Sequence, residues 1–303
     1  MRYVVTGAAG FIGSHLAEAL LERGHEVIGI DCFTDYYDPA LKEENARGLD
    51  VLRLDLAQDP LDFAGFDGVF HLAGQPGVRT SWRDFDLYVQ RNLVATQKLV
   101  EQAAGAGVRI VFASSSSVYG DAERYPTPEN VPPRPISPYG VTKLACEQLI
   151  GAHERSAGLD AVVVRYFTVY GPRQRPDMAF ARLLAAFAEG SPFELYGDGS
   201  QSRGFTYVAD AVEATIAAME GGHGVYNVGG GTEATMLEAI RIAEEVSGRT
   251  LDVRTLPAAT GDVRRTAADV SRIRAELGWE PRVGLRAGLQ AQWEWASSRV
   301  GAR

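Results

Sequence analysis

The sequence predicts a doubly wound α/β fold, in which helices cover both faces of a parallel β-sheet. Short runs rich in β-branched residues recur along the chain, and these runs are apolar throughout instead of alternating with polar residues. Strands that are buried on both faces of a parallel sheet have this continuous apolar character. Helical patterns lie between the runs, as crossover connections between parallel strands require.

Six strand-like runs occur in the first part of the chain, and helical patterns separate them. The runs start at residues 2, 26, 50, 68, 109 and 160 and read RYVVT, EVIGID, DVLRLD, GVFHLA, RIVFAS and DAVVVRYF. The helical patterns cover residues 11–23, 84–104 and 138–155. The first pattern stops before Gly24, and glycine is common just past a helix C-terminus.

After Gly171 the pattern becomes less regular. A helix is predicted over 179–189, a strand GVYNVGG at 224, and two further helical stretches on either side of TLPAATGDVRRT. We therefore predict two interleaved units. A sheet domain covers 1–171 plus about 202–235, and a smaller α/β lobe that binds the substrate covers about 172–201 plus 236–303.

Composition and charge exclude several classes of partner. The chain has 303 residues, of which 46% are hydrophobic, and its 30 basic and 39 acidic side chains give a formal charge of −9. No basic run could neutralise successive phosphates, which argues against nucleic acid and anionic membranes. No apolar run of about 18 residues is present. Cys32 and Cys146 lie far apart and outside any metal-binding spacing, so we expect reduced packing residues in a cytoplasmic protein.

A glycine motif follows the first strand directly. Gly7, Gly10 and Gly13 lie in TGAAGFIGSH and open the first helix, where glycines permit a tight turn and the approach of a pyrophosphate. Asp31 ends the second strand, where a carboxylate accepts hydrogen bonds from ribose hydroxyls and repels a 2′-phosphate. The motif predicts a Rossmann-like sheet that binds NAD in preference to NADP.

Further contacts with the cofactor are predicted from residues in this motif and at other strand ends. Asp55, after the third strand, is a candidate for the adenine end, although it could equally cap a turn. The remaining predicted contacts are Phe11, Ile12, Leu56, Leu72, Ala73 and Tyr166.

Tyr139 and Lys143 in SPYGVTK are four residues apart at the start of a helix, so their side chains share one face. A phenol is a poor base at neutral pH, but a nearby ammonium group and a positively charged nicotinamide both favour the phenolate. This pair could take a proton from a sugar hydroxyl while NAD takes a hydride. The spacing alone is also typical of a surface helix, and the preceding dinucleotide motif favours the catalytic interpretation.

The whole chain resembles the extended short-chain dehydrogenase/reductase family, and within it the nucleotide-sugar epimerases and dehydratases. The similar segments are VTGAAGFIGSHL, SSVYG, SPYGVTK, RYFTVYGPR, GDGSQSRGFTYVAD, YNVGGG and LGWEP. The resemblance implies that Ser115 is the catalytic hydroxyl, which donates or relays a hydrogen bond to the sugar 4-oxygen beside Tyr139. It also implies a homodimer through the helix before the fifth strand and the helix that carries Tyr139.

The two positions after Ser115 bear on the reaction class. In the dehydratases of this family they resemble Asp-Glu, and in the decarboxylases that make UDP-xylose the second is usually Glu, whereas here they are Ser116 and Ser117. Without a carboxylate, no group is evident for chemistry at C5 of the sugar. The favoured reaction is therefore oxidation and then reduction of the same carbon. This is an epimerisation, and it returns NAD unchanged.

The segments DCFTDYYDPALKEENAR, HLAGQPGVRTSW and RYFTVYGPRQRPDMAF resemble UDP-glucuronic acid 4-epimerases more than galactose epimerases. Thr168 stands where galactose epimerases usually have Asn. A uronate carries a negative charge that needs an arginine or several neutral donors. Arg175 and Arg79 are candidates for the sugar, together with Thr168, Ser116 and Ser117. By resemblance, Arg203, Asp262 and Arg264 hold the phosphates and ribose of the nucleotide.

Oxidation of C4 in a glucuronate makes a β-keto acid, which loses carbon dioxide readily when its carboxylate stands perpendicular to the carbonyl plane. An epimerase must therefore clamp that carboxylate near the plane. The main prediction is UDP-glucuronate 4-epimerisation. The alternatives are 4-epimerisation of UDP-glucose or UDP-N-acetylglucosamine, decarboxylation to a UDP-pentose, and a non-enzymatic NAD sensor on the same fold.

Three residues near these motifs have a structural interpretation beside a functional one. His71 is interpreted as a packing residue, and the histidines and acidic residues form no metal-binding spacing. Tyr36 and Tyr37 could lie in a loop on the substrate side or in a polar surface turn.

Overall fold

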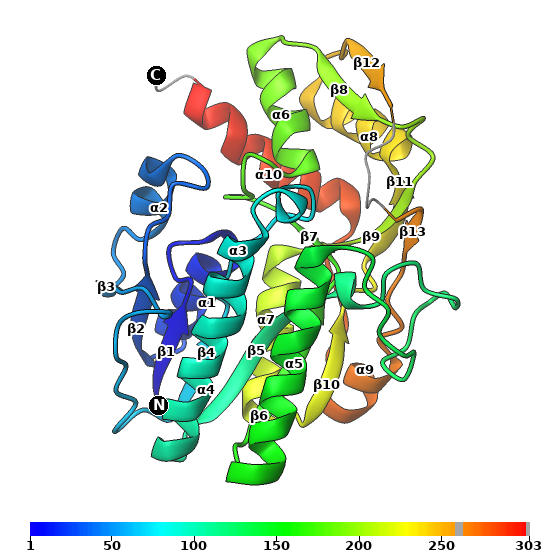
Figure 1. The fold of residues 1–303 in the computed structure, drawn as a ribbon. Coiled ribbons are helices and arrows are strands. Elements are labelled where there is room, and N and C mark those ends of the chain that lie inside the picture. Colours follow the sequence, from blue (N-terminus) through cyan, green and yellow to red (C-terminus); the bar gives the residue numbers. More distant parts are fainter. Residues whose placement is uncertain (258–262, 301–303) are drawn as a thin grey trace.

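The computed structural model describes residues 1–257 and 263–300, and a seven-stranded sheet lies at its centre (Figure 1). The strand order is β10-β6-β5-β4-β1-β2-β3, and the neighbouring strands are parallel. The order reverses at β1 and β4, where a crevice opens at the carboxyl ends of the strands. The strands are β1 (Arg2–Thr6), β2 (Glu26–Asp31), β3 (Val51–Arg53), β4 (Gly68–His71), β5 (Arg109–Ser115), β6 (Ala161–Tyr166) and β10 (Gly224–Val228). The predicted doubly wound sheet is confirmed.

Helices cover both faces of this sheet. α1 (Phe11–Glu22), α7 (Val208–Gly221) and α9 (Ser271–Leu277) contribute to the buried apolar cluster on one face, and α4 (Ala95–Ala106) and α5 (Pro138–Ala157) to the cluster on the other. Figure 1 shows α4 and α5 running side by side along the near face. The sequence interpretation did not include α7.

The helix predicted over 84–104 is wrong as a single α-helix. The structure has α3 (Phe85–Tyr88), a π-helical segment over Val89–Val94, and then α4. The wide turns of the π-helix rotate the side chains that follow, and such segments are frequent at functional sites. Asn92 lies within this segment and is buried.

The smaller lobe has its own buried core between α6 (Ala179–Glu189), α8 (Met236–Ser247) and α10 (Leu285–Val300). One small sheet has the order β11-β9-β13 with β7 beside β9, and a two-stranded sheet pairs β12 with β8. The bounds are β7 (Thr168–Tyr170), β8 (Phe193–Tyr196), β9 (Ser202–Tyr207), β11 (Thr232–Thr235), β12 (Val253–Leu256) and β13 (Arg265–Thr266). Because α7 and β10 lie in the large unit between β9 and β11, the two units interleave along the chain. The predicted domain boundaries stay a prediction.

The remaining short helices are α2 (Pro39–Asn45) and two 3₁₀ segments, Thr80–Trp82 and Ser116–Val118. Both cysteines are free thiols. Cys146 is buried in the core as predicted, but Cys32 is exposed, so its interpretation as a packing residue is wrong. Cys32 follows β2 directly and lines the cavity above the sheet, where its side chain is accessible. Among the described helices, none has the length and apolar character to cross a membrane.

Candidate active site

The glycine-rich turn lies between β1 and α1 at one end of a cavity above the sheet. Gly7 has φ +72°, and its amide donates to the carbonyl of Ile30 at 2.7 Å. A Cβ on Gly13 would lie 2.1 Å from the carbonyl oxygen of Gly7, so only glycine lets α1 pack directly on the turn. Gly10 caps α1 without a side-chain hydrogen bond, and no acidic residue occupies the first turn. The amides at this helix start therefore suit a pyrophosphate.

Asp31 lies at the end of β2 and is buried. Its carboxylate accepts from the amide of Ala9 at 3.2 Å and from the amide of Phe33 at 2.8 Å. Lys42 of α2 is also buried, with its Nζ 3.9 Å from Asp31 Oδ1 and 2.9 Å from the hydroxyl of Thr34. Burial lowers the pKa of Lys42, and the charge of Asp31 opposes this shift. Lys42 was missed, because an isolated lysine in a polar helix gives no sequence signal.

The predicted cofactor residues line a single cavity. Asp55 is one of them, and it also caps a turn, because its side chain accepts from the amide of Ala57 at 2.9 Å and from Gln58 Nε2 at 3.2 Å. The two interpretations of Asp55 are therefore compatible. The full predicted set in the cavity wall is Gly7, Gly10, Phe11, Ile12, Gly13, Asp31, Asp55, Leu56, Leu72, Ala73, Tyr139, Lys143 and Tyr166.

The π-helical segment builds another part of the wall that the sequence interpretation missed. Asn92 is buried, and its Oδ1 accepts from the amide of Gln75 at 2.6 Å while its Nδ2 donates to the Thr142 hydroxyl at 3.1 Å. Arg91 donates to Gln75 Oε1 at 2.8 Å. Gln75 and Arg91 both line the cavity. The widened helix thus joins the loop after β4 to α5.

Tyr139 and Lys143 lie in the first turns of α5 and line the same cavity as the glycine turn. The helix starts here because Ser137 caps it, accepting from the amide of Gly140 at 3.1 Å, and Pro138 occupies the first helical position. Lys143 is buried, and its Nζ donates to the carbonyl of Ala113 in β5 at 2.9 Å.

The serines of the run from Ser114 to Ser117 have different contacts. Ser114 lines the cavity and donates to Glu147 Oε1 at 2.5 Å. Glu147 is buried and forms an ion pair with Arg165 of β6, with 2.6 Å between Oε2 and Nη2. Neither charge faces water, and each has a hydrogen-bonded partner, as buried ions require. This Ser114–Glu147–Arg165 group ties α5 to both β5 and β6.

Ser115, Ser116 and Ser117 are half-buried at the end of β5. The Ser115 hydroxyl donates to the Ser117 hydroxyl at 3.1 Å and accepts from the Ser117 amide at the same distance. A Cβ on Gly140 would lie 2.5 Å from the Ser117 carbonyl oxygen. The turn of α5 that carries Tyr139 therefore packs directly on the backbone of the serine run.

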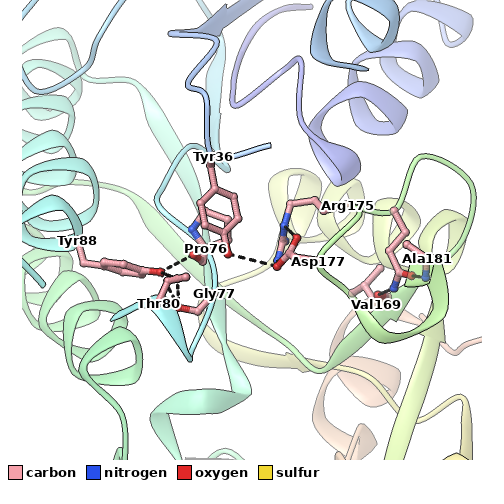
Figure 2. A network of polar contacts seen from close by, with 10 residues as sticks. Tyr36, Pro76, Gly77, Thr80, Tyr88, Val169, Arg175, Asp177 and Ala181 are labelled. Atoms are coloured by element: carbon pink, nitrogen blue, oxygen red, sulfur yellow. Dashed lines mark hydrogen bonds and ion pairs between the residues drawn. The ribbon is translucent and has the colours of Figure 1, made fainter. Parts of the chain in front are cut away.

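Arg175 also lines the cavity, whereas Thr168 is half-buried at the start of β7. Arg175 pairs with Asp177, with Nε–Oδ1 and Nη2–Oδ2 distances of 3.0 and 3.1 Å, and Asp177 Oδ2 accepts from the Tyr36 hydroxyl at 3.3 Å (Figure 2). Burial acts to lower the pKa of Arg175, but Asp177, Tyr36 and Tyr139 raise it above its ordinary value. The loop with Tyr36 therefore reaches the cavity.

The predicted arginines Arg79, Arg203 and Arg264 are not among the residues that line the cavity with Arg175. The Arg79 guanidinium lies 4.1 Å from the ring centroid of Tyr196 in β8. Arg203 of β9 donates through Nη1 to the carbonyl of Ser202 at 2.8 Å and to that of Arg264 at 3.4 Å. Arg264 is exposed. Asp262 lies outside the described residues.

His71 ends β4 and is fully buried. Its ring nitrogens bond the hydroxyls of Thr6 at 2.8 Å and Thr96 at 3.0 Å, and burial lowers its pKa to about 3. These contacts support the structural interpretation of His71. Among residues 1–257 and 263–300, no group of three or more His, Cys, Asp or Glu side chains is arranged to hold a metal ion.

Comparisons with known proteins add to this geometry. The model of the NAD-dependent epimerase/dehydratase family matches residues 3–229. An uncharacterised UDP-glucose epimerase, YtcB, from Bacillus subtilis is 40% identical, and the match covers 98% of each chain. The crystal structure of a UDP-glucuronic acid 4-epimerase from Bacillus cereus with UDP-glucuronic acid and NAD is 39% identical, with a TM-score of 0.95 and coverage of 99% of this chain and 100% of that one.

MoeE5 has been solved with UDP-glucuronic acid and NAD and with UDP-glucose and NAD. Each structure is 42% identical to this chain, with TM-scores of 0.90 and 0.88. The first match covers 99% of this chain, the second covers 100%, and both cover all of MoeE5.

Proposed function

The chain belongs to the NAD-dependent epimerase/dehydratase family, and we propose that it epimerises UDP-glucuronic acid at C4 to UDP-galacturonic acid through a transient 4-keto sugar. The observation that carries the proposal is that Tyr139, Lys143 and Arg175 line one cavity together with the glycine turn. The three side chains are a phenol, an ammonium group and a guanidinium, which supports a site that takes a proton from a sugar hydroxyl and binds a carboxylate.

NAD fits the residues present, because the glycine turn leaves room that a Cβ would fill and Asp31 presents a carboxylate in the cavity wall. Gly7, Gly10, Gly13 and Asp31 would hold it. When bound, its chemistry is to accept the hydride from C4 and return it to the same carbon.

Tyr139 is the base in this proposal. Its phenolate takes the proton of the 4-hydroxyl and returns it after the sugar has turned over. The ammonium group of Lys143 stabilises the phenolate, and the Ser115 hydroxyl donates to the sugar 4-oxygen. The packing of Gly140 on the Ser117 carbonyl supports these roles, because it keeps Tyr139 beside the serine run.

The hydroxyls of Ser116 and Ser117 support epimerisation over dehydration, since neither can remove a proton from C5. Arg175 receives the uronate carboxylate and, with Thr168 and these hydroxyls, keeps it near the plane of the 4-keto group. Decarboxylation is then disfavoured. Arg203, Asp262 and Arg264 bind the nucleotide, and Arg79 closes the sugar end from the loop after β4.

We also propose that the protein works in the cytoplasm as a homodimer through α4 and α5. The exposed apolar side chain of Val141 on α5, which is 47% exposed, supports this interface. UDP-glucose is a second candidate substrate, because the charge of Arg175 is already paired with that of Asp177.

Product analysis tests the substrate. The purified protein with NAD should convert UDP-glucuronate to UDP-galacturonate, with little carbon dioxide released. Conversion of UDP-glucose alone would overturn the uronate proposal, and release of carbon dioxide with a UDP-pentose would indicate a decarboxylase instead.

Tyr139→Phe tests the base. We expect kcat to fall by about 10³-fold, because general acid–base catalysis contributes about 10²–10⁴-fold, while NAD still binds. Tyr3→Phe is the matched control, since Tyr3 packs against Phe70 and His25 away from the cavity. Unchanged turnover in Tyr139→Phe would overturn the assignment.

A further inference from the structure

Two loops of the large unit meet a segment of the smaller lobe at the sugar end of the cavity. Tyr36 comes from the loop after β2, Gly77 and Thr80 follow β4, and Asp177 precedes α6. Figure 2 shows Tyr36 pointing at Asp177, with Arg175 on the other side of the same carboxylate. Asp177 thus joins the loop after β2 to the arginine that is proposed to bind the substrate.

The position of Tyr36 is tightly determined. A Cβ on Gly77, which has φ +98°, would lie 2.3 Å from the Tyr36 hydroxyl oxygen and 2.8 Å from the Thr80 hydroxyl. Tyr88 holds this turn by donating to the carbonyls of Pro76 and Gly77, each at 2.6 Å. The Tyr36 hydroxyl is therefore held against the turn while it donates to Asp177.

The pairing of Asp177 with Arg175 uses one side of the guanidinium. Asp177 accepts from Nε and Nη2, which are two of the donor groups of a side chain that has five N–H bonds in all. Arg175 lines the cavity, so the same side chain faces the substrate. Asp177 therefore holds the Arg175 guanidinium in a defined orientation, and this guanidinium already forms an ion pair with one carboxylate.

The charge of this pair determines what the sugar end attracts. Arg175 and Asp177 together carry no net charge, and their side chains are only 21% and 37% exposed, so water screens them incompletely. The neighbouring Arg173 pairs with Glu18 of α1 at 2.9 Å, so it adds a second neutral pair. The carboxylate of a uronate therefore meets an arginine whose charge is already neutralised by Asp177. When a neutral hexose binds instead, Arg175 still has Asp177 as its ion-pair partner.

We propose that Asp177 determines the preference between charged and neutral sugars, by acting as the resident counter-ion of Arg175. The inference rests on the proposed function, in which Arg175 faces C6 of the sugar. Loss of the Asp177 charge leaves a net positive arginine, which strengthens binding of a uronate and weakens binding of a hexose. The binding of both UDP-glucose and UDP-glucuronic acid by MoeE5 is a property of that protein, and it shows that related sites can admit both.

Asp177→Asn is the direct test, because asparagine removes the charge and keeps one oxygen that accepts from Arg175, although its amide nitrogen replaces the second accepting oxygen. The binding of UDP-glucuronate and UDP-glucose is measured by calorimetry on the NAD-loaded Tyr139→Phe protein, with and without Asp177→Asn. We expect the ratio of the two dissociation constants to shift about 10-fold toward UDP-glucuronate, since removing a unit charge a few ångströms away in a half-screened site is worth about one power of ten.

Asp252→Asn is the matched control. Asp252 also pairs with an arginine two residues away, Arg254, at 3.4 Å, but this pair is exposed on β12 and does not line the cavity. Its ratio should equal that of the parent protein.

An unchanged ratio in Asp177→Asn, an equal change for both ligands, or a shift toward UDP-glucose would overturn the inference. Failure of the proposed function is seen separately, as absence of UDP-galacturonate from the wild-type protein, because the binding ratio is measured without turnover.

Discussion

The cofactor end and the sugar end of the cavity are built in different ways. The residues predicted for the cofactor end lie at the ends of strands of one parallel sheet, in the loops that follow them and on α1 and α5, and every one of them lies in the cavity wall. The sugar end combines loops from both units. Of its predicted arginines, Arg175 lines the cavity, whereas Arg79 lies over Tyr196 and Arg203 bonds the carbonyl of Ser202. Regular structure thus builds the proposed cofactor end, and contacts between distant loops build the proposed sugar end.

Gly13→Ala should break the cofactor end with the largest effect. The new Cβ would lie 2.1 Å from the carbonyl oxygen of Gly7, and a backbone atom cannot yield as a flexible side chain can. We expect a loss of stability of about 3 kcal/mol and a loss of NAD affinity of about 100-fold or more. Thermal unfolding and calorimetry with NAD measure the two effects.

The control for this substitution is Gly105→Ala. Gly105 lies in α4 with no atom within 4 Å of the new Cβ, so alanine should stabilise the helix by about 0.5–1 kcal/mol. Wild-type NAD affinity in Gly13→Ala would contradict the role of close backbone packing at the glycine turn.

Arg175→Lys should damage the sugar end alone. Lysine keeps the charge but cannot bind a carboxylate through a planar fork. We expect kcat/KM to fall about 100-fold for UDP-glucuronate, as for loss of one good charged hydrogen bond, and to stay within about 3-fold for UDP-glucose. Carbon dioxide release per turnover should rise, because the carboxylate is no longer held near the keto plane.

Steady-state kinetics with both substrates measure this difference, and Arg254→Lys on β12 is the control, since it replaces an exposed arginine of the same pair type. An equal loss with both substrates would show that Arg175 does not read the carboxylate.

The smallest expected effect is the contribution of His71 to the pH dependence of stability. It tests the structural interpretation of this buried residue. Its pKa is about 3 in the folded protein and about 6.5 when unfolded. Below pH 6.5, His71 therefore binds a proton in the unfolded chain but not in the folded protein. The free energy of unfolding falls as the pH falls. Between pH 6.5 and 5.5 this linkage should cost about 1 kcal/mol.

Urea unfolding at several pH values in this range measures the slope. The His71→Asn variant should show a slope that is smaller by that amount, whatever its absolute stability. The same slope in both proteins would contradict the assignment of the shift to His71.

The two ends also differ in how well the sequence predicted them. Gly7 follows β1 directly and Asp31 ends β2, and the carboxyl ends of parallel strands meet at one edge, so the local pattern is enough to place them together. Lys42 and Gln75 gave no such signal. Lys42 meets Asp31 through a tertiary contact between α2 and the end of β2, and Gln75 is bonded to Asn92 in a π-helical segment for which the sequence predicts regular helix.

Elements of the fold that depend on contacts distant in the sequence were also harder to predict. The buried strands were found because a continuous apolar run identifies them, whereas the short strands of the smaller lobe, such as β7 and β13, are fixed mainly by pairing with β9. Tyr36 illustrates the consequence for the site. Its loop could not be assigned to surface or substrate until its contact with Asp177, 141 residues further along the chain, was known.

The buried Glu147–Arg165 pair has a mechanical consequence. Glu147 lies two turns beyond Tyr139 on the same face of α5, about 12 Å along the axis. It accepts a hydrogen bond from Ser114 of β5 and forms an ion pair with Arg165 of the adjacent β6. The helix therefore cannot slide or rotate without exposing a charge to an apolar interior. The pair therefore fixes the position of α5 relative to the sheet, and with it the position of Tyr139, which we propose as the base.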